Sequence, residues 1–477
     1  MGGFFGVVSK ENCTRDLFFG TDYHSHLGNQ RGGMLVWGRR GGLQRSIHDI
    51  TNAQFRSKFQ YDVERLKGKI GIGSISDTGD QPLIVFSRLG TYGITMVGAV
   101  KNLAKLSKNA FSEEHRAHFC EKTGTGINPT EMVASLISLG DTFKDGIKLA
   151  QDKVQGSCSM LLLVKDGIYA VRDRLGRTPV VIGEKEGSYA ATLETSALYN
   201  LGYQVKHWLG PGEAVLLTSD GMTQVLPPQD RMQICAFLWV YYGFPASSYE
   251  GINVENARYR CGAKLAERDS DLVVDGVAGI PDSGTAHALG YANASCCQPS
   301  RTPVPYKRAF VKYTPTWPRS FIPSDQITRK LIAKMKLLPI EDMIRGQRLL
   351  FCEDSIVRGT QLRETFKILM KDMGAREVHV RCACPPIMFN CKFLNFSRAH
   401  NIMALASRKA IFALEGNCNS RLSEYCNDAS ECYLRMVEEI RSDLKLTTLK
   451  YQKLDDLVAA IGLPREKLCT YCWDGKE

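Results

Sequence analysis

The chain has 477 residues, of which 44% are apolar and 23% are charged. This composition is that of an ordinary globular protein, and because one hydrophobic core rarely grows beyond roughly 250 residues, we expect two domains. The formal net charge is +11, but Lys and Arg are scattered along the chain rather than grouped in blocks. This pattern argues against a nucleic-acid binder and favours a small, phosphate-rich ligand.

The sequence shows neither a membrane span nor a secretory signal. No stretch approaches the ~20 apolar residues of a transmembrane helix, and the first residues lack the basic, apolar and small-residue regions of a signal peptide. We therefore expect a cytoplasmic protein with no membrane or nucleic-acid partner. Its 16 cysteines are then expected to be buried apolar side chains, metal ligands or redox groups rather than disulfides.

The first half of the chain, to about residue 230, consists of short apolar runs broken by Gly, Asp and Asn. Such runs predict strands and turns with few helices. We expect strands at 69–75, 159–166 and 213–218, and helices at 131–139 and 195–201. These elements together predict a layered α/β domain.

From Cys235 onward the pattern changes to alternating helices and strands. The expected helices are 251–268, 284–294 and 361–373, and the expected strands are 272–277, 348–352 and 377–382. Alternation of this kind predicts a parallel sheet with helices on its faces.

The segment 349–361 is the most informative part of the sequence. An apolar strand ends at two adjacent carboxylates, Glu353 and Asp354, and a turn of Ser, Arg, Gly and Thr leads into an amphipathic helix. In an open parallel sheet, ligands bind at the carboxyl ends of the strands, and free N–H groups of the next helix bind phosphate. Acidic residues here often only cap a helix. Two of them before Arg-Gly-Thr favour a phosphorylated ribose, with the carboxylates accepting its hydroxyls or helping to hold Mg²⁺.

Two further segments fit a phosphate site. Residues 279–286 join a strand to a helix through a turn of small residues, which lets the backbone approach a pyrophosphate closely, although such a turn alone is usually not a site. Lys312 and the segment 319–323 lie in a stretch that contains Pro and basic residues. We expect this stretch to be a lid that brings cations to a leaving pyrophosphate.

These three segments, in this order, resemble those of the type I phosphoribosyltransferases. The run Glu-Asp-Ser-Ile-Val-Arg-Gly-Thr at 353–360 is similar to the signature loop of their amidotransferase branch. The resemblance implies a doubly wound parallel sheet that binds 5-phosphoribosyl-1-pyrophosphate (PRPP). It implies catalytic roles for Glu353 and Asp354, which hold the ribose and Mg²⁺, and for Arg319 of the lid. The other PRPP-binding residues that it implies are Asp282, Ser283, Gly284, Lys312, Ser355, Arg358, Gly359, Thr360 and Gln361.

Motifs of the first half resemble the glutaminase domain of the glutamine phosphoribosylpyrophosphate amidotransferase family. They lie at 17–20, 26–28, 30–33, 169–176, 194–197 and 211–213. The resemblance implies a four-layer αββα domain of the N-terminal-nucleophile (Ntn) hydrolase type at 1–230, a type I phosphoribosyltransferase domain at 231–455 and a tail at 456–477. It also implies a homo-oligomer, dimer or tetramer, that uses PRPP with ammonia or a small amine, and purine nucleotides as effectors.

Several positions depart from this family's pattern. The glutaminase chemistry needs a Cys at the mature N-terminus, because the free α-amine activates the thiol, and this chain has Gly2. The nearest thiol, Cys13, is internal. The family's Arg for the glutamine carboxylate is missing at 71–76, and Val97 stands in place of the Asn of the oxyanion hole. We therefore expect an inactive glutaminase half. The second half also departs at three positions. Glu353 stands where the family usually has Asp, Gln361 stands where it has a second Thr, and Phe244 stands where it has Arg.

The C-x-x-C formed by Cys469 and Cys472 has the spacing of either a metal site or a redox site. The family resemblance adds Cys235 and Cys391, which match positions that hold a 4Fe-4S centre in the cluster-bearing branch. The resemblance thus implies these four thiolates as ligands of a structural 4Fe-4S cluster, with a zinc site as the alternative.

The function that the resemblance implies is the first step of purine biosynthesis. The chain is expected to form 5-phosphoribosylamine and pyrophosphate from PRPP, using ammonia because the glutaminase site is degenerate. Two alternatives stay open: a non-catalytic regulator that binds PRPP or nucleotides, and a phosphoribosyltransferase with another acceptor.

Overall fold

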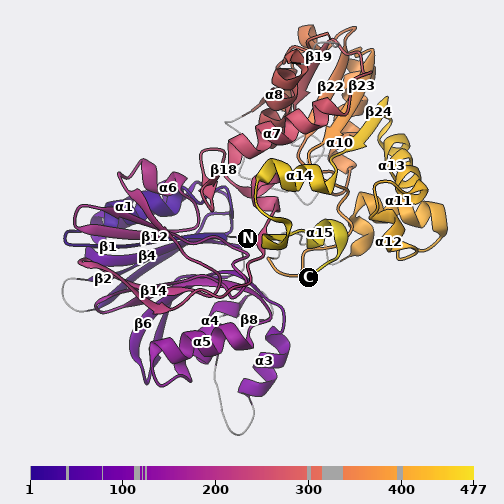
Figure 1. The fold of residues 1–477 in the computed structure, drawn as a ribbon. Helices are drawn as coiled ribbons and strands as arrows, with labels where there is room; N and C mark the ends of the chain where they lie inside the picture. Colours follow the sequence, from indigo (N-terminus) through magenta and orange to yellow (C-terminus); the bar gives the residue numbers. More distant parts are fainter. Residues whose placement is uncertain are drawn as a thin grey trace.

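The computed structural model describes residues 2–38, 42–77, 79–111, 119–120, 122–123, 126–297, 302–313, 337–394 and 401–477. Figure 1 shows two bodies: the amino-terminal half lies at the lower left and most of the carboxy-terminal half at the upper right. The end of the chain returns to the junction between them. None of the described helices is both long and apolar enough to cross a membrane.

The amino-terminal half is built on two antiparallel sheets. The first has, in spatial order, β13 (Gln204–Trp208), β11 (Val181–Lys185), β12 (Ser188–Thr192), β1 (Gly2–Ser9), β4 (Gly68–Ser76), β2 (Arg31–Gly38) and β3 (Leu43–Asp49). The second has β15 (Gly221–Leu226), β14 (Ala214–Thr218), β10 (Gly167–Val171), β9 (Gly156–Val164), β6 (Gly90–Val100) and β5 (Leu83–Ser87). Apolar side chains of both sheets, such as Phe4, Leu35 and Leu161, share one fully buried core.

Helices cover the outer faces of this sandwich (Figure 1). On the first sheet lie α1 (Thr14–Asp22), α2 (Phe55–Arg65) and α6 (Ser196–Tyr199); on the side of the second lie α3 (Leu103–Ala110), α4 (Pro129–Ser138) and α5 (Phe143–Lys153). A short hairpin is formed by β7 (Lys122–Thr123) and β8 (Gly126–Ile127). α4 begins where Asn128 accepts a hydrogen bond from Thr130 N, with Pro129 at the first helical position. The αββα layering expected from the sequence is confirmed.

The carboxy-terminal half contains a four-stranded, all-parallel sheet. Its strands, in spatial order, are β19 (Gly276–Gly279), β22 (Arg348–Glu353), β23 (Glu377–Cys382) and β24 (Thr448–Tyr451). The strand expected at 272–277 was placed too early. Pairing with β22 begins only at Gly276, and Val273 is 63% exposed, so its apolar character does not mark a buried strand.

Helices lie around this sheet (Figure 1). They are α7 (Val254–Glu267), α8 (Ser283–Cys296), α10 (Thr360–Lys367), α11 (Ala406–Glu415), α12 (Leu422–Tyr425) and α13 (Glu431–Leu444). The helix expected at 361–373 is divided, because the chain after α10 widens into a π-helical turn, η3 (Ile368–Asp372). A separate two-stranded sheet pairs β20 (Phe310–Lys312) with β21 (Leu337–Pro339). Single 3-10 turns are η2 (Glu341–Met343), η4 (Ile402–Ala404) and η5 (Arg465–Lys467).

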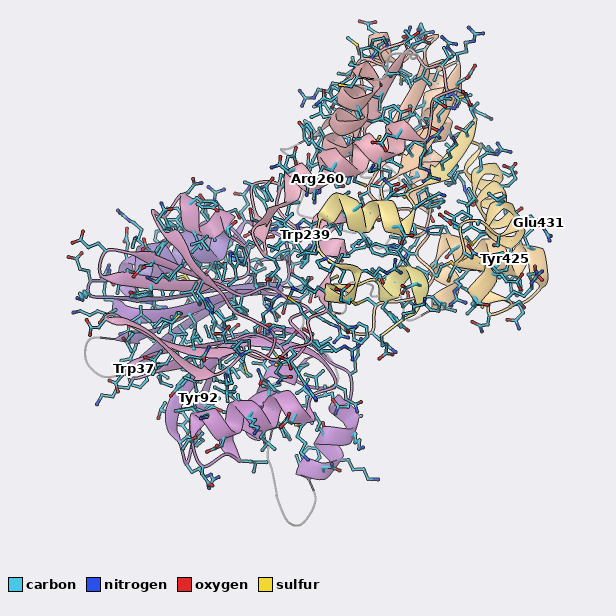
Figure 2. All side chains as sticks on the ribbon, in the orientation of Figure 1. Trp37, Tyr92, Trp239, Arg260, Tyr425 and Glu431 are labelled. Carbon is cyan, nitrogen blue, oxygen red and sulfur yellow. The ribbon has the colours of Figure 1, made fainter. Side chains whose placement is uncertain are left out.

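The junction joins segments that are far apart in the sequence. β16 (Ile234–Cys235) pairs in parallel with β25 (Leu468–Cys469) near the end of the chain. The short elements here are the π-helical turn η1 (Leu238–Tyr242), β17 (Ser248–Tyr249), β18 (Ile252–Asn253), α14 (Leu454–Ile461) and α15 (Tyr471–Asp474). Arg260, labelled near Trp239 in Figure 2, donates to the carbonyls of Ala460 and Ile461 at the end of α14. The tail is therefore fastened to α7 as well as to β16.

Candidate functional site

The two predicted phosphate loops meet at one edge of the parallel sheet. β19 and β22 are neighbours, with Gly279 opposite Cys352, so the loops that follow both strands start side by side. Ser283 Oγ of the first loop donates to Asp354 Oδ1 of the second, at 2.6 Å. Ser355 Oγ donates to the other oxygen, Oδ2, at 2.7 Å. Asp354 thus ties the two loops together through both of its carboxylate oxygens.

Glycine is required where the first loop packs on the end of β22. A Cβ on Gly284 would lie 2.3 Å from the carbonyl oxygen of Cys352, and a Cβ on Gly279 would lie 2.6 Å from Gly284 O. Both distances are too short for real contacts. Glycine at these two positions therefore lets the first loop pack directly on the end of β22.

The second loop ends at the start of α10. Gly359 adopts a left-handed conformation, with φ of 72°, directly before Thr360 begins the helix. Of the predicted phosphate ligands, Arg358 and Thr360 are exposed, and Gly359 is buried. The first N–H groups of a helix have no partner within the helix, so this loop has the geometry of a phosphate site. The side chain of Gln361 lies outside the described part of the structure.

Glu353 is the buried member of the acidic pair. Its side chain is 8% exposed, and Oε2 has no hydrogen-bond partner among the described residues. Burial, with the adjacent Asp354 as a second cause, raises the pKa of Glu353 well above its usual range. An orphaned buried carboxyl group is costly. A ligand hydroxyl or a cation at this point would satisfy it.

The predicted lid is only partly described. Lys312, at the end of β20, forms an ion pair with Asp282 of the first loop, and both side chains are about half exposed or more. Arg319, expected to be the lid cation, lies outside the described residues. The structure thus brings Asp282, Ser283, Gly284, Lys312, Glu353, Asp354 and Ser355 together at one edge.

Comparisons with known proteins agree over almost the whole chain. A model of a glutamine amidotransferase domain matches residues 67–200. The amidophosphoribosyltransferase of Methanothermobacter thermautotrophicus is 30% identical, over 99% of this chain and 93% of the relative. The chain belongs to the amidophosphoribosyltransferase family. The family member of Methanocaldococcus jannaschii is 28% identical over 100% of this chain and 97% of its own length.

Solved structures of family members have the same fold. The glutamine PRPP amidotransferase of B. subtilis, in complex with ADP and GMP, superposes with a TM-score of 0.82 at 26% identity, covering 99% of this chain and 96% of the other. A second structure, that of an allosteric regulatory enzyme of purine biosynthesis, gives the same TM-score and identity. The family and the fold class expected from the sequence are confirmed.

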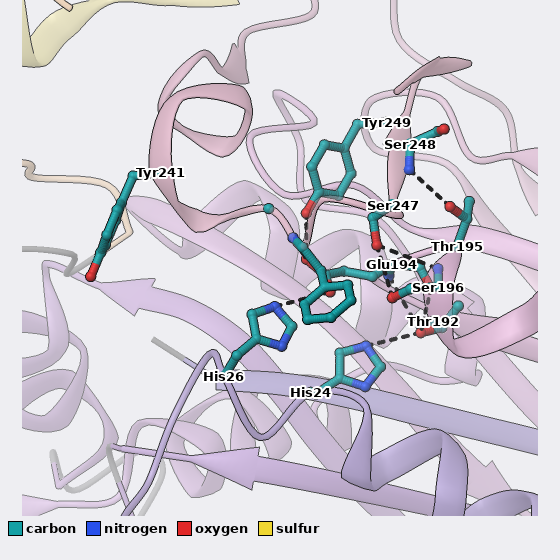
Figure 3. Close-up of polar contacts among 12 residues, drawn as sticks. His24, His26, Thr192, Glu194, Thr195, Ser196, Tyr241, Ser247, Ser248 and Tyr249 are labelled. Carbon is teal, nitrogen blue, oxygen red and sulfur yellow. Dashed lines mark hydrogen bonds and ion pairs between the residues drawn. The ribbon is translucent and has the colours of Figure 1, made fainter. Parts of the chain in front are cut away.

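The start of β1, at Gly2 and Gly3, is closely packed. A Cβ on Gly2 would lie 2.4 Å from Ile75 O, and a Cβ on Gly3 would lie 2.5 Å from the ring of His24. His24 is itself held by Gly20 O and by Thr192 Oγ1, as Figure 3 shows in part. Cys13, the nearest thiol in sequence, is buried, and burial raises its pKa above the usual range.

Glu194 is the centre of a buried cluster of polar groups between the two halves (Figure 3). One oxygen, Oε2, lies 3.0 Å from His26 Nε2, and Oε1 accepts hydrogen bonds from Tyr249 OH at 2.5 Å and Phe244 N at 3.1 Å. Burial opposes the charge of Glu194, but His26 and the hydrogen bonds outweigh it and lower the pKa. The cavity beside this polar cluster has a volume of about 10 Å³, which is room for about one water molecule.

Further hydrogen bonds join the two halves around this polar cluster. Ser247 Oγ donates to Ser196 Oγ at 2.9 Å, and Ser248 N donates to Thr195 Oγ1 at 2.8 Å. The sequence marked the segment 194–197 as a family motif but gave no signal for its partners at 244–249. Those partners lie about fifty residues away and are ordinary residue types.

The four cysteines implied as metal ligands gather at the junction. Cys235 and Cys469 are paired in the β16–β25 ladder, and the Cys472 thiol is hydrogen-bonded with Cys391. Burial, followed by the neighbouring Cys469 and Cys391, raises the pKa of Cys235 well above its usual range. Within the described ranges, no three His, Cys, Asp or Glu side chains are arranged to hold a single metal ion.

Proposed function

We propose that this chain is a phosphoribosyltransferase that makes 5-phosphoribosylamine and pyrophosphate from PRPP and ammonia, the first step of purine biosynthesis. The observation that carries the proposal is the Ser283–Asp354–Ser355 hydrogen-bonded link, which joins the two phosphate loops of a chain that belongs to the amidophosphoribosyltransferase family. A ligand that reaches both loops needs a phosphate at each end of a hydroxylated ring, and PRPP has this form.

Different residues bind the different parts of PRPP. The 5′-phosphate is assigned to the loop from Ser355 to Gln361, and the pyrophosphate to the loop from Asp282 to Gly284. Glu353 and Asp354 accept the ribose hydroxyls between these ends, which fixes the anomeric carbon for attack and gives Glu353 Oε2 a partner. Mg²⁺, held by the same acidic pair and the pyrophosphate, would neutralise charge on the leaving group.

The lid cations act on the leaving pyrophosphate. Lys312 already faces Asp282 beside the pyrophosphate loop, and Arg319 is assigned the same role from the sequence. Cations aimed at charge that develops in the transition state stabilise it more than the ground state. Neutral ammonia attacks the anomeric carbon as pyrophosphate leaves, and it needs no dedicated general base.

We further propose that the glutaminase half is inactive, so that ammonia comes from solution or from another protein. Position 2 carries no thiol and has no room for a side chain, Cys13 is buried with a raised pKa, and the hollow beside Glu194 has no space for a glutamine. Loss of a nucleophile removes covalent catalysis.

The four cysteines are proposed as a metal site. A tetrahedral zinc ion needs all four sulfurs about 2.3 Å from one point, whereas each thiolate of a 4Fe-4S cluster binds its own iron and the sulfurs stay farther apart. The described residues gather four thiols without a single-ion geometry. The 4Fe-4S cluster is proposed from the family resemblance, with zinc as the alternative.

A regulator that binds purine nucleotides is the second candidate. It is supported by the B. subtilis relative, whose structure was solved with ADP and GMP. The two functions differ in turnover, because a regulator would bind PRPP or a nucleotide without releasing pyrophosphate.

The test is pyrophosphate release from PRPP by anaerobically purified protein with Mg²⁺ and an ammonium salt. We expect steady release by the wild type and none by Ser283→Ala/Asp354→Asn, in which both loops lose their shared link. PRPP binding without release by the wild type would reject the transferase and support the regulator.

A further inference from the structure

We propose that Arg177, from the amino-terminal half, is a positioning residue of the four-cysteine site, where it donates N–H bonds to the sulfurs and supplies their counter-charge. This inference rests on the metal site proposed above. It gives the glutaminase-like half a role that does not depend on glutamine: that half completes the metal site of the other half.

The turn that carries Arg177 is rigidly attached to a proposed ligand. Arg177 follows β10 and is 4% exposed. Its backbone N–H donates to both carboxylate oxygens of Asp173, at 2.7 and 2.8 Å. Its carbonyl accepts a hydrogen bond from the backbone N–H of Cys235 at 3.1 Å. The position of Arg177 relative to Cys235 is therefore set by the backbone, not by a flexible side chain.

The guanidinium group of Arg177 reaches across the junction. Its Cζ lies 3.6 Å from the centre of the Phe393 ring, two residues after Cys391. One nitrogen, Nη2, donates to Gln233 Oε1 at 3.1 Å, and the group is also hydrogen-bonded to the Cys469 thiol. Arg177 therefore contacts two of the four proposed ligands, Cys235 through its backbone and Cys469 through its side chain.

One donor of Arg177 is left over. Nε is buried and has no hydrogen-bond partner among the described residues. The guanidinium charge is attracted to the buried carboxylate of Asp173, but a buried donor without a partner is costly. Four thiolates outweigh the positive charge of a zinc ion or of an iron–sulfur core, so the loaded site is an anion at this place. The sulfurs of that site would provide the missing partner.

Other cations near the cysteines are less suited. Arg408 already donates Nε to Met388 O and Nη1 to Cys418 O. Lys392 is 43% exposed and forms an ion pair with Glu477. Arg177 is a buried cation that contacts the Cys469 thiol and keeps one donor without a partner among the described residues. Hydrogen bonds to cluster sulfurs stabilise the reduced, more negative state and so raise the reduction potential.

The experiment compares full-length Arg177→Gln, Arg177→Lys and wild-type protein after anaerobic reconstitution with iron and sulfide, and separately with zinc. Arg174→Gln is the control, because Arg174 lies in the same turn and is exposed. The readouts are metal per chain, the rate of metal loss to a chelator and, for iron, the midpoint potential. We expect Arg177→Gln to lose metal about 10- to 100-fold faster, the usual effect of removing such an outer partner, and to have a lower potential. Arg177→Lys should lie between.

The potential separates this role from simple packing, because a purely structural Arg177 would change metal content without moving the potential of the cluster that remains. Equal metal loss and equal potentials in Arg177→Gln and Arg174→Gln would overturn the inference while leaving the cysteine site intact. A wild type that takes up neither metal would overturn both.

Discussion

The phosphate loops and the amino-terminal site both contain buried acidic residues, but their partners differ. At the loops, Glu353 Oε2 has no partner among the described residues, and Lys312 and Asp282 stay exposed. At the amino-terminal site, Glu194 is held by His26, Tyr249 and Phe244. The first region has polar groups ready for a ligand, whereas the second has used its groups within the protein.

The glycines of the two regions are alike, because each lets the backbone pack closely against other parts of the protein. A Cβ on Gly284 would lie 2.3 Å from Cys352 O, and Cβ atoms on Gly2 and Gly3 would lie 2.4 Å from Ile75 O and 2.5 Å from the His24 ring. The difference between the two regions therefore lies in the partners of their polar groups and not in their glycines.

The largest effect is expected from Asp354→Asn. The carboxylate of Asp354 accepts one hydrogen bond on each of its two oxygens, from Ser283 and from Ser355. The side chain of Asn has one oxygen and no charge, so it cannot accept both hydrogen bonds in this way. We expect ammonium-dependent pyrophosphate release to fall by about 10²-fold or more, as when a positioned polar group at a reacting centre is removed. Asp342→Asn, at an exposed position of η2, should leave the rate unchanged. A similar rate in both variants would show that the link between the loops does not organise the site.

A methyl group on Gly284 is the next test. Gly284→Ala places Cβ against Cys352 O, so the loop must move away from β22. Overpacking of this kind costs about 1–3 kcal/mol, and we expect weaker PRPP binding in calorimetry together with a lower Tm. Gly221→Ala is the control, because a Cβ there meets nothing within 4 Å. Unchanged PRPP affinity in Gly284→Ala would remove this loop from the proposed site.

Tyr249→Phe tests the polar cluster around Glu194. The variant removes one hydrogen bond to a charged, buried acceptor, which costs about 1.5–3 kcal/mol. We expect a lower free energy of unfolding in urea and little change in ammonium-dependent activity. Tyr61→Phe, at a position that is 75% exposed, should change neither. Loss of activity at unchanged stability would give the polar cluster a direct role in the reaction.

The pH dependence of stability tests Glu353. Its pKa is raised by burial and by Asp354, so folding takes up a proton, and the stability from Glu353 is present at low pH and lost as the pH rises through the folded pKa. Without PRPP or Mg²⁺, Glu353→Gln should be more stable than the wild type near pH 8, and the difference should shrink toward about pH 5. The control is Glu364→Gln, at an exposed position. A constant difference across this range would contradict a protonated Glu353.

The sequence located local elements of the carboxy-terminal half better than it located contacts between the two halves, for a physical reason. Residues 353–360 form one continuous loop, and β23 was predicted at its observed bounds, because both depend on neighbours in the sequence. Contacts across the junction do not: Tyr249 with Glu194 and Arg177 with Phe393 join ordinary residue types over long separations. The strand at 272–277 was misplaced because an apolar run before Gly276 lies outside the sheet, where only strand pairing could reveal its end.

The most direct test of the contrast is to measure pyrophosphate release with ammonium and with glutamine, using the wild type and Gly2→Cys. The account predicts release with ammonium by both proteins and none with glutamine by either, because a Cβ at position 2 would lie 2.4 Å from Ile75 O. Glutamine-dependent release by the wild type would contradict an inactive amino-terminal site. Release with glutamine only by Gly2→Cys would show that the site lacks a thiol but has kept its shape.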